Sequence, residues 1–565
     1  MSALLSRGPF GAIVRDLTHL CLALLGGVLL TVAWPASGSL SPLLFVGLVP
    51  FMLVVELRCP PGAPCAGRGT GWMLFAGLAL WNLVTTSWLG QVQEGWGTRV
   101  LLGVGVMLAN SGLQLIPFAI GRRVRRRYGR WAGWAAFAGW WMAWEVLHMR
   151  WDLQWPWLTL GNGFAARPQW VQWYELTGHL GGSVWVLLTN LLVLRWFLSG
   201  GRVRAAWGPL LLMTVPVLLS WVRFITYAER GDPLEVVVVQ PNIDPYSEKF
   251  GGIDPLVQLD GMLALAEPEM TDSTRLLLLP ETALQEPSRV FITDGGELEL
   301  AGLWENDLEA SGSVQRIRAW HKRHPRCAVL AGMSSSRLLD VDERTVTARP
   351  IGGTDRYYDA ANAALFVAPG EPAAAYRKSK LVAGVELLPF EALLGGLEAL
   401  SIDMGGTTGS LAQQVERTVF RPADHRYGAA PVICYESVFG DYVADYVRNG
   451  ADLIAIITND AWWGDSYGYR QHLAYASLRA IECRRAIARS ANTGISCFVD
   501  QRGIIHQPTA WWQEAAIRRT VLLNNARSPF VALGEVVRWA SLLAGAAALM
   551  AAFLPWGVPS ARRRP

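Results

Sequence analysis

A series of apolar segments constrains the fold of this 565-residue chain more than any other feature. Seven segments follow one another in the first part of the chain and an eighth lies near its end: 17–35, 41–57, 71–90, 100–121, 131–149, 178–200, 208–224 and 531–554. Each has close to the ~20 residues that an α-helix needs to cross a hydrocarbon core roughly 30 Å thick. The sequence therefore predicts a polytopic α-helical membrane bundle of about eight transmembrane helices.

Composition agrees with a membrane protein and excludes some partners. Hydrophobic residues make up 52% of the chain and charged residues 17%, and there are 27 Trp, a residue typical of membrane–water interfaces. The net charge of +4 is too small to indicate a nucleic-acid partner. The seven cysteines show no paired C-x-x-C spacing, so we expect neither a metal nor a cofactor.

The arginines predict the orientation of the bundle. The basic connections are every second one, and their arginines are Arg7, Arg15, Arg58, Arg68, Arg122, Arg123, Arg125, Arg126, Arg127, Arg130, Arg202, Arg204, Arg562, Arg563 and Arg564. Since basic loops stay on the cytoplasmic side, both termini are expected in the cytoplasm. The long segment between the seventh and eighth helices must then face outward.

That outward segment has the pattern of an α/β domain. Short apolar runs of strand length recur at 235–240, 276–280, 328–332, 363–368, 430–434 and 453–458, with helical patterns at 311–323, 439–449 and 470–489. Strands that alternate with helices indicate sheets covered by helices. We divide the chain into a bundle at 1–232, an outward α/β domain at 233–520, and a last helix with a basic tail at 521–565.

Three residues with reactive side chains each stand just after a segment expected to be a strand. Glu281 comes after Leu276–Pro280, Lys378 stands in Tyr376-Arg-Lys-Ser-Lys380, and Cys434 ends Ala430–Cys434. A thiol needs a base before it becomes a good nucleophile, and Glu281 could supply one. Lys378, with a backbone N–H near Tyr435, could hold an oxyanion. The three residue types together predict acyl transfer through a Cys434 nucleophile.

Several motifs occur around these residues in a recognisable order: Val238-Val-Gln-Pro-Asn-Ile243, Leu279-Pro-Glu-Thr282, Tyr376–Glu386, Ile433-Cys-Tyr-Glu-Ser437 and Thr458-Asn-Asp-Ala-Trp-Trp-Gly464. The set resembles the carbon–nitrogen hydrolase (nitrilase) superfamily with its Glu-Lys-Cys triad. A nitrilase-like domain between membrane helices is similar to one branch, the apolipoprotein N-acyltransferases. Gln154-Trp-Pro-Trp157 also resembles a loop of that branch. The resemblance implies an α-β-β-α sandwich as the fold of the outward domain.

The resemblance also implies roles. Glu281 would be the base, Lys378 the oxyanion partner and Cys434 the nucleophile. The supporting active-site residues would be Glu386, which we expect to orient Lys378, and Tyr435 and Glu436, which flank the nucleophile. Trp462 and Trp463 are candidates for a lipid entrance or for anchors at the membrane surface.

The reaction implied by the family takes a fatty acyl chain from a phospholipid, resembling phosphatidylethanolamine, onto Cys434 as a thioester. It then passes the chain to the α-amine of the diacylglyceryl-cysteine of a bacterial apolipoprotein. This would take place on the periplasmic side of the inner membrane, and we expect a monomer.

Three other interpretations fit parts of the sequence. A membrane-tethered amidase or hydrolase would use the same triad with water as the acceptor. A transporter with an outer regulatory domain would carry charges inside the membrane, and Glu145 is the main candidate for one. An outer domain without catalysis would not need all three triad residues. The bundle favours the acyltransferase, because both of its substrates are lipids.

Overall fold

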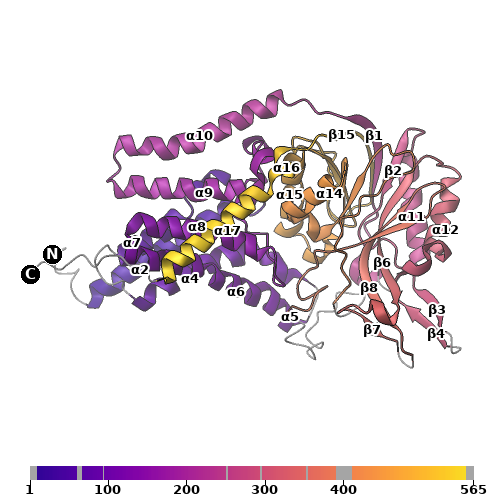
Figure 1. The fold of residues 1–565 in the computed structure, drawn as a ribbon, viewed down its shortest axis with the longest axis horizontal. Coiled ribbons are helices and arrows are strands. Elements are labelled where there is room, and N and C mark those ends of the chain that lie inside the picture. Colours follow the sequence, from indigo (N-terminus) through magenta and orange to yellow (C-terminus); the bar gives the residue numbers. More distant parts are fainter. Residues whose placement is uncertain are drawn as a thin grey trace, which may run out of the picture.

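A computed structural model describes residues 9–59, 67–92, 95–249, 252–292, 296–351, 354–389 and 410–554. A bundle of helices forms one side of the molecule and a domain of sheets and helices forms the other, as Figure 1 shows. The predictions that concern Arg7 and Arg562–Arg564 lie outside the described residues.

Helices occupy all eight of the predicted apolar segments. The helices of the bundle are α2 (Pro9–Ala33), α3 (Val49–Arg58), α4 (Gly67–Thr85), α5 (Trp96–Val100), α6 (Val106–Leu113), α7 (Leu115–Tyr128), α8 (Arg130–His148), α9 (Tyr174–Leu198), α10 (Val203–Thr226), α16 (Pro529–Leu533) and α17 (Glu535–Phe553). A π-helical turn at Leu101–Gly105 joins α5 to α6.

Six helical stretches of the described residues are long and apolar enough to cross a membrane: Ala12–Ala33, Ser41–Arg58, Trp96–Tyr128, Tyr174–Leu198, Val203–Thr226 and Glu535–Phe553. The other two predicted segments form α4 and α8, which have the length of a membrane helix but carry several Trp residues. Eight crossings therefore remain a prediction.

Helix α17 lies along α7 and α8, although hundreds of residues separate them in the sequence (Figure 1). Arg123 Nε donates to Ala552 O at 2.8 Å and Arg127 Nη1 to Leu554 O at 3.1 Å, so side chains of α7 satisfy carbonyls that the end of a helix leaves without partners. Arg125 makes a buried ion pair with Glu56 of α3. Part of the basic cluster predicted to mark the cytoplasmic side thus also holds the bundle together.

Two large sheets build the α/β domain. The first has the order β15-β1-β2-β6-β8-β7, with β5 beside β6 and β9 beside β8, and the second has the order β10-β11-β12-β13-β14. The strands are β1 (Asp232–Gln240), β2 (Thr274–Leu278), β3 (Ser288–Ile292), β4 (Gly296–Leu300), β5 (Leu303–Trp304), β6 (Ala328–Leu339), β7 (Arg349–Pro350), β8 (Tyr357–Val367), β9 (Ala374–Arg377), β10 (Ala429–Ile433), β11 (Leu453–Thr458), β12 (Ala486–Ala491), β13 (Cys497–Val499), β14 (Ile505–His506) and β15 (Ala515–Leu523).

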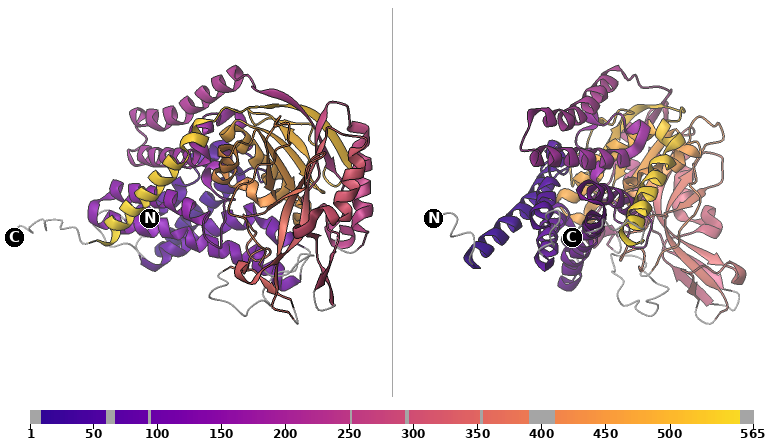
Figure 2. Two further views of the ribbon diagram at one scale, coloured as in Figure 1. Left: turned by 45° about the vertical axis from the view of Figure 1, so that its right-hand side comes forward. Right: turned by 60° about the vertical axis from the view of Figure 1, so that its left-hand side comes forward.

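The alternation of side chains along β1 assigns the layers. Val237 and Val239 belong to a core shared with α11 (Pro255–Ala266) and α12 (Gly312–His321). Val236 and Val238 face the other way, into the core that includes the second sheet. Helices α14 (Gly440–Arg448) and α15 (Tyr467–Cys483) cover the outer face of the second sheet and lie on the side of the bundle, as the two views in Figure 2 agree. The predicted α-β-β-α sandwich is confirmed.

One predicted helix is too long. The pattern at 470–489 suggested a single helix, but α15 ends at Cys483 and Arg484 adopts a left-handed conformation with φ 50°. The chain then enters β12, which pairs in parallel with β11. The buried Arg484 and Arg485 stabilise this corner by donating to the carbonyls of Gln501 and Ala451.

Candidate active site

Glu281 and Lys378 meet in the interior of the domain. Glu281 follows β2 and Lys378 directly follows β9, both strands of the first sheet. Lys378 Nζ lies 3.1 Å from Glu281 Oε1, and the two residues expose only 1% and 5% of their surface. Burial of a charge is costly unless a partner of opposite charge accompanies it, and here each residue provides that partner for the other.

Glu386 and Asn362 complete the surroundings of the ammonium group. Glu386 Oε1 accepts from Lys378 Nζ at 2.9 Å, and Asn362 Nδ2 donates to both Glu281, at 2.8 Å, and Glu386, at 2.9 Å. The predicted contact between Glu386 and Lys378 is present. Lys378 therefore lies between two carboxylates whose orientation one amide fixes.

Cys434 belongs to the second sheet, whereas Glu281 and Lys378 belong to the first. It follows β10 directly and is the first residue of a 3₁₀ turn at Cys434–Val438, with φ 49°. A left-handed conformation is rare for a residue with a side chain and typical of strained functional positions. The thiol is buried and senses the charges of Glu281 and Lys378, so the three predicted residues belong to one electrostatic cluster.

The pKa directions define the resting state of this cluster. Burial raises the pKa of the Cys434 thiol far above its usual value, and the charge of Glu281 raises it further. Burial alone would raise the pKa of Glu281, but Lys378 and Asn362 lower it below the usual value overall. Burial would likewise lower the pKa of Lys378, but Glu281 and Glu386 raise it well above its usual value. The resting site therefore holds Cys434 as a thiol, Glu281 as a carboxylate and Lys378 as an ammonium.

Glu436 ties the nucleophile turn to the loop that carries Lys378. One of its oxygens accepts from Ile433 N at 2.8 Å, and the other accepts from Ser379 N at 2.7 Å and from the hydroxyls of Tyr376 and Tyr442. Burial raises the pKa of Glu436. The side chain bridges the turn after β10 in the second sheet and the segment after β9 in the first.

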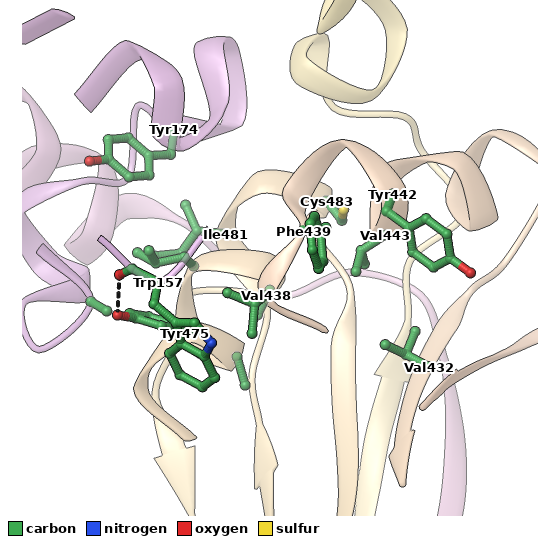
Figure 3. Close-up of a cluster of buried hydrophobic side chains, with 14 of the residues drawn as sticks. Trp157, Tyr174, Val432, Val438, Phe439, Tyr442, Val443, Tyr475, Ile481 and Cys483 are labelled. Atoms are coloured by element: carbon green, nitrogen blue, oxygen red, sulfur yellow. Dashed lines mark hydrogen bonds between the residues drawn. The ribbon is translucent and has the colours of Figure 1, made fainter. Parts of the chain in front are cut away.

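Tyr435 connects the nucleophile to the membrane bundle. Its hydroxyl donates to Gln154 O at 2.8 Å, and its ring lies parallel to that of Trp157, with centroids 6.3 Å apart. Gln154 and Trp157 belong to the loop between α8 and α9 that the sequence singled out. Figure 3 shows Trp157 beside Tyr475, whose hydroxyl donates to Trp157 O at 2.8 Å. The bundle thus contacts the domain directly beneath the nucleophile.

The two candidate entrance residues lie in different surroundings. Trp463 packs against Trp88 and Trp157 at centroid distances of 4.8 and 5.7 Å. Trp462 contacts Tyr246 at 5.2 Å. Both are half-buried. Trp463 extends the aromatic cluster between domain and bundle, while Trp462 lies on the side of the first sheet.

Several residues of the site were not predicted from the sequence. Lys249, which is buried, donates to Glu281 O at 2.8 Å, and burial lowers its pKa to about 7. Asn459 N donates to Glu281 Oε2 at 3.0 Å. Thr458 lies close enough to the Cys434 thiol to lower its pKa. Two of these contacts use the backbone, which sequence patterns do not show. The sequence feature that could have indicated Lys249 is its place as the one lysine between Pro245 and Pro255.

The remaining features are structural. Glu145 is buried, and it accepts from Trp141 Nε1 at 3.1 Å and from Leu160 N at 2.9 Å. Cys327, Cys483 and Cys497 are buried free thiols. In the parts of the chain that the structure describes, no three His, Cys, Asp or Glu side chains are grouped so as to hold a metal ion.

Comparison with known proteins decides the family. Residues 26–192 match the model of the apolipoprotein N-acyltransferase N-terminal domain, and residues 216–528 match the carbon-nitrogen hydrolase model. Apolipoprotein N-acyltransferase of Chlorobaculum tepidum is 31% identical over 96% of this chain and 98% of its own length. The chain belongs to the apolipoprotein N-acyltransferase family. The relative from Geobacter metallireducens is 28% identical over 94% of both chains.

Solved structures resemble the α/β domain. Saccharomyces cerevisiae Nit3, a member of the nitrilase superfamily, covers 55% of this chain and 94% of its own, with 16% identity and a TM-score of 0.34. An amidase from Nesterenkonia covers 55% and 97%, with 16% identity and a TM-score of 0.33. The family and the long apolar helices together make the chain a bacterial membrane protein.

Proposed function

We propose that this protein transfers a fatty acyl chain from a phospholipid to the α-amine of the N-terminal diacylglyceryl-cysteine of a lipoprotein, through a thioester on Cys434. Membership of the apolipoprotein N-acyltransferase family supports acyl transfer in lipoprotein maturation. The observation that carries the mechanism is the buried Lys378–Glu281 pair, whose charges act on the thiol of Cys434.

In the first step, the Cys434 sulfur attacks the ester carbonyl of the phospholipid and Glu281 accepts the thiol proton. The carbonyl oxygen becomes an oxyanion, which Lys378 and the Tyr435 N–H stabilise. The ester C–O bond then breaks, and Glu281 returns the proton to the leaving alkoxide. The products are a lysophospholipid and a thioester on Cys434.

The second step repeats this sequence with an amine. The free α-amine of the lipoprotein attacks the thioester carbonyl, and Glu281 accepts one of its protons. The C–S bond breaks and the proton returns to sulfur, which regenerates the thiol. Because a thioester is more reactive towards amines than an oxygen ester, two moderate barriers replace one high barrier.

The pKa directions explain why Glu281 must act during attack rather than before it. A buried thiol with a raised pKa does not ionise at rest next to a carboxylate with a lowered pKa. Proton transfer becomes favourable only as negative charge leaves sulfur for the oxyanion beside Lys378. The thiol therefore stays protonated, and protected from unwanted chemistry, until a carbonyl is bound.

Lipid substrates suit a site that lies next to a bundle of apolar helices. We propose the division 1–232, 233–520 and 521–565, with both termini cytoplasmic and the domain periplasmic. The donor would resemble phosphatidylethanolamine, Trp462 and Trp463 would line its entrance, and one copy of the chain would suffice. In support, the aromatic cluster of Trp88, Trp157 and Trp463 joins bundle and domain next to Tyr435.

The test is a transfer assay in vesicles of phosphatidylethanolamine with a diacylated lipopeptide. We expect lysophospholipid and N-acylated peptide to appear in equal amounts, with none from Cys434→Ala. The same peptide with an acetylated α-amine is the matched control and should accept no acyl chain. Free fatty acid in place of acylated peptide would instead identify a hydrolase and overturn the proposal.

A further inference from the structure

We propose that His472, oriented by Asp460, is a positioning residue that aims the Tyr435 N–H at the oxyanion of the proposed reaction. The inference rests on the proposed function, because the oxyanion that the Tyr435 N–H would stabilise forms only in the proposed acyl transfer. His472 lies on α15, and neither it nor Asp460 exposes any surface.

The imidazole of His472 contacts the nucleophile turn on one side and a carboxylate on the other. Its Nε2 lies 3.0 Å from Cys434 O and 2.8 Å from Ser437 Oγ, and Ser437 Oγ itself donates to Cys434 O at 2.8 Å. Its Nδ1 lies 2.9 Å from Asp460 Oδ1. Both ring nitrogens face acceptor oxygens, so the two contacts form together when each nitrogen carries a hydrogen; Ser437 Oγ and His472 Nε2 then both donate to the carbonyl of the nucleophile.

Asp460 is in turn firmly placed. Arg489 Nη2 donates to Asp460 Oδ2 at 2.5 Å, and Thr458 Oγ1 donates to Asp460 Oδ1 at 2.8 Å. Burial would raise the pKa of Asp460, but Arg489 and His472 lower it overall, so the group is a carboxylate that accepts from Nδ1. A Cβ at position 494 would lie 2.6 Å from Asp460 Oδ2, so the glycine there leaves the room that this carboxylate occupies.

Peptide geometry links this arrangement to catalysis. The C=O of Cys434 and the N–H of Tyr435 belong to one planar trans peptide, so they point in opposite directions. Fixing the carbonyl towards His472 and Ser437 fixes the N–H towards the other side. The left-handed φ of 49° at Cys434 would not persist unless surrounding contacts held it. His472 supplies one of those contacts without touching the substrate.

The same segment also positions the base. Asn459, next to Asp460 after the end of β11, donates its N–H to Glu281 Oε2, and Thr458 lies close enough to the Cys434 thiol to lower its pKa. Three consecutive residues thus hold the base, the nucleophile and, through His472, the oxyanion donor. The structure assigns to this turn the alignment of the whole site.

The experiment separates oxyanion stabilisation from thiol reactivity. The first probe is phosphatidylethanolamine in mixed micelles, with acylation of Cys434 followed over time by intact mass. The second is an N-alkyl iodoacetamide, which alkylates the thiol without creating an oxyanion. In His472→Leu we expect the acylation rate constant to fall about a hundredfold, which is the usual effect of losing one oxyanion donor. The lipid concentration that gives half-saturation and the rate of thiol alkylation should both stay unchanged.

Two further variants serve as controls. His472→Gln keeps a donor that can reach Cys434 O but loses Asp460, so its rate should lie between those of the wild type and His472→Leu. His321, a buried histidine of α12, contacts nothing in the site, and His321→Leu should acylate like the wild type. Folding of each variant is checked by its thermal unfolding midpoint.

Other results would overturn the inference. If the wild type forms the thioester and His472→Leu forms it equally fast, the positioning role is wrong. An equal loss of acylation and alkylation would show a general disturbance of Cys434 and would also contradict it. If the wild type itself forms no thioester, the proposed function fails first, and the alkylation arm still reports whether the thiol was accessible.

Discussion

Among single residues, the buried thiol of Cys434 has the most specific chemical environment. Burial and the neighbouring Glu281 raise its pKa, so thiolate is scarce at neutral pH. We therefore predict that iodoacetamide alkylates Cys434 slowly, with a rate that keeps rising about tenfold per pH unit between about pH 6 and pH 9 and reaches no plateau there. Intact mass measured against time at each pH gives the rate. Glu281→Gln, which removes the adjacent negative charge, should alkylate faster, and a sigmoidal rise centred near pH 7 in the wild type would contradict the account.

The buried Lys249 should make the stability of the folded protein depend on pH. Its pKa falls from 10.5 to about 7 because of burial, so between these values the unfolded chain binds a proton that the folded protein lacks. Stability then rises with pH across that window, and the burial of the charged form costs most below about pH 7. Lys249→Met should raise the unfolding midpoint more at about pH 6 than at about pH 9, measured by thermal unfolding in detergent.

The control for Lys249 is Lys322→Met, because Lys322 is exposed. Its effect on the midpoint should be small and independent of pH. An equal shift for Lys249→Met at both pH values would show that Lys249 does not change protonation in this range.

At the scale of elements, the loop between α8 and α9 is the part of the bundle that matters most for the site. Trp157 is 1% exposed and contacts Tyr435, Trp463 and His472. Truncation of a buried Trp costs about 3–5 kcal/mol. We predict that Trp157→Ala lowers the unfolding midpoint and also slows acyl transfer, because Tyr435 loses its neighbour.

The comparison variant is Trp72→Ala on α4, whose side chain is 65% exposed. Its stability should change by no more than about 0.5 kcal/mol, the usual size for an exposed position. If Trp157→Ala proves as mild as Trp72→Ala in both unfolding and transfer assays, the loop does not support the site.

The positions of helices and strands could be predicted from the sequence better than the residues at which they end. Strands β1, β2, β10 and β11 were predicted because their apolar runs have strand length, and Glu281, Lys378 and Cys434 were found because each follows a strand. The helix was predicted to reach residue 489 because arginine and alanine favour helices. It ends at Cys483, because the residues that follow pair with β11 as a strand of the second sheet. Asn362 was missed because one polar residue inside an apolar strand gives no signal of its partners.

For the whole molecule, the distribution of arginines predicts that the domain faces the periplasm. Val346 lies in the domain and is 93% exposed, while Arg126 lies on the exposed side of the basic end of α7. In a background without exposed cysteine, we predict that a membrane-impermeant maleimide labels Val346→Cys in intact spheroplasts and labels Arg126→Cys only after lysis. The reverse pattern would invert the proposed topology.

The central claim is that Cys434 carries the acyl chain between two lipid substrates. Intact mass spectrometry of the purified protein after incubation with phospholipid, and again after addition of a diacylated lipopeptide, tests it directly. We predict a gain of one fatty-acyl mass in the wild type, its loss to the peptide amine in the second stage, and neither change in Cys434→Ala. A folded wild-type protein that gains no acyl mass from any phospholipid, or a Cys434→Ala variant that still transfers, would contradict it.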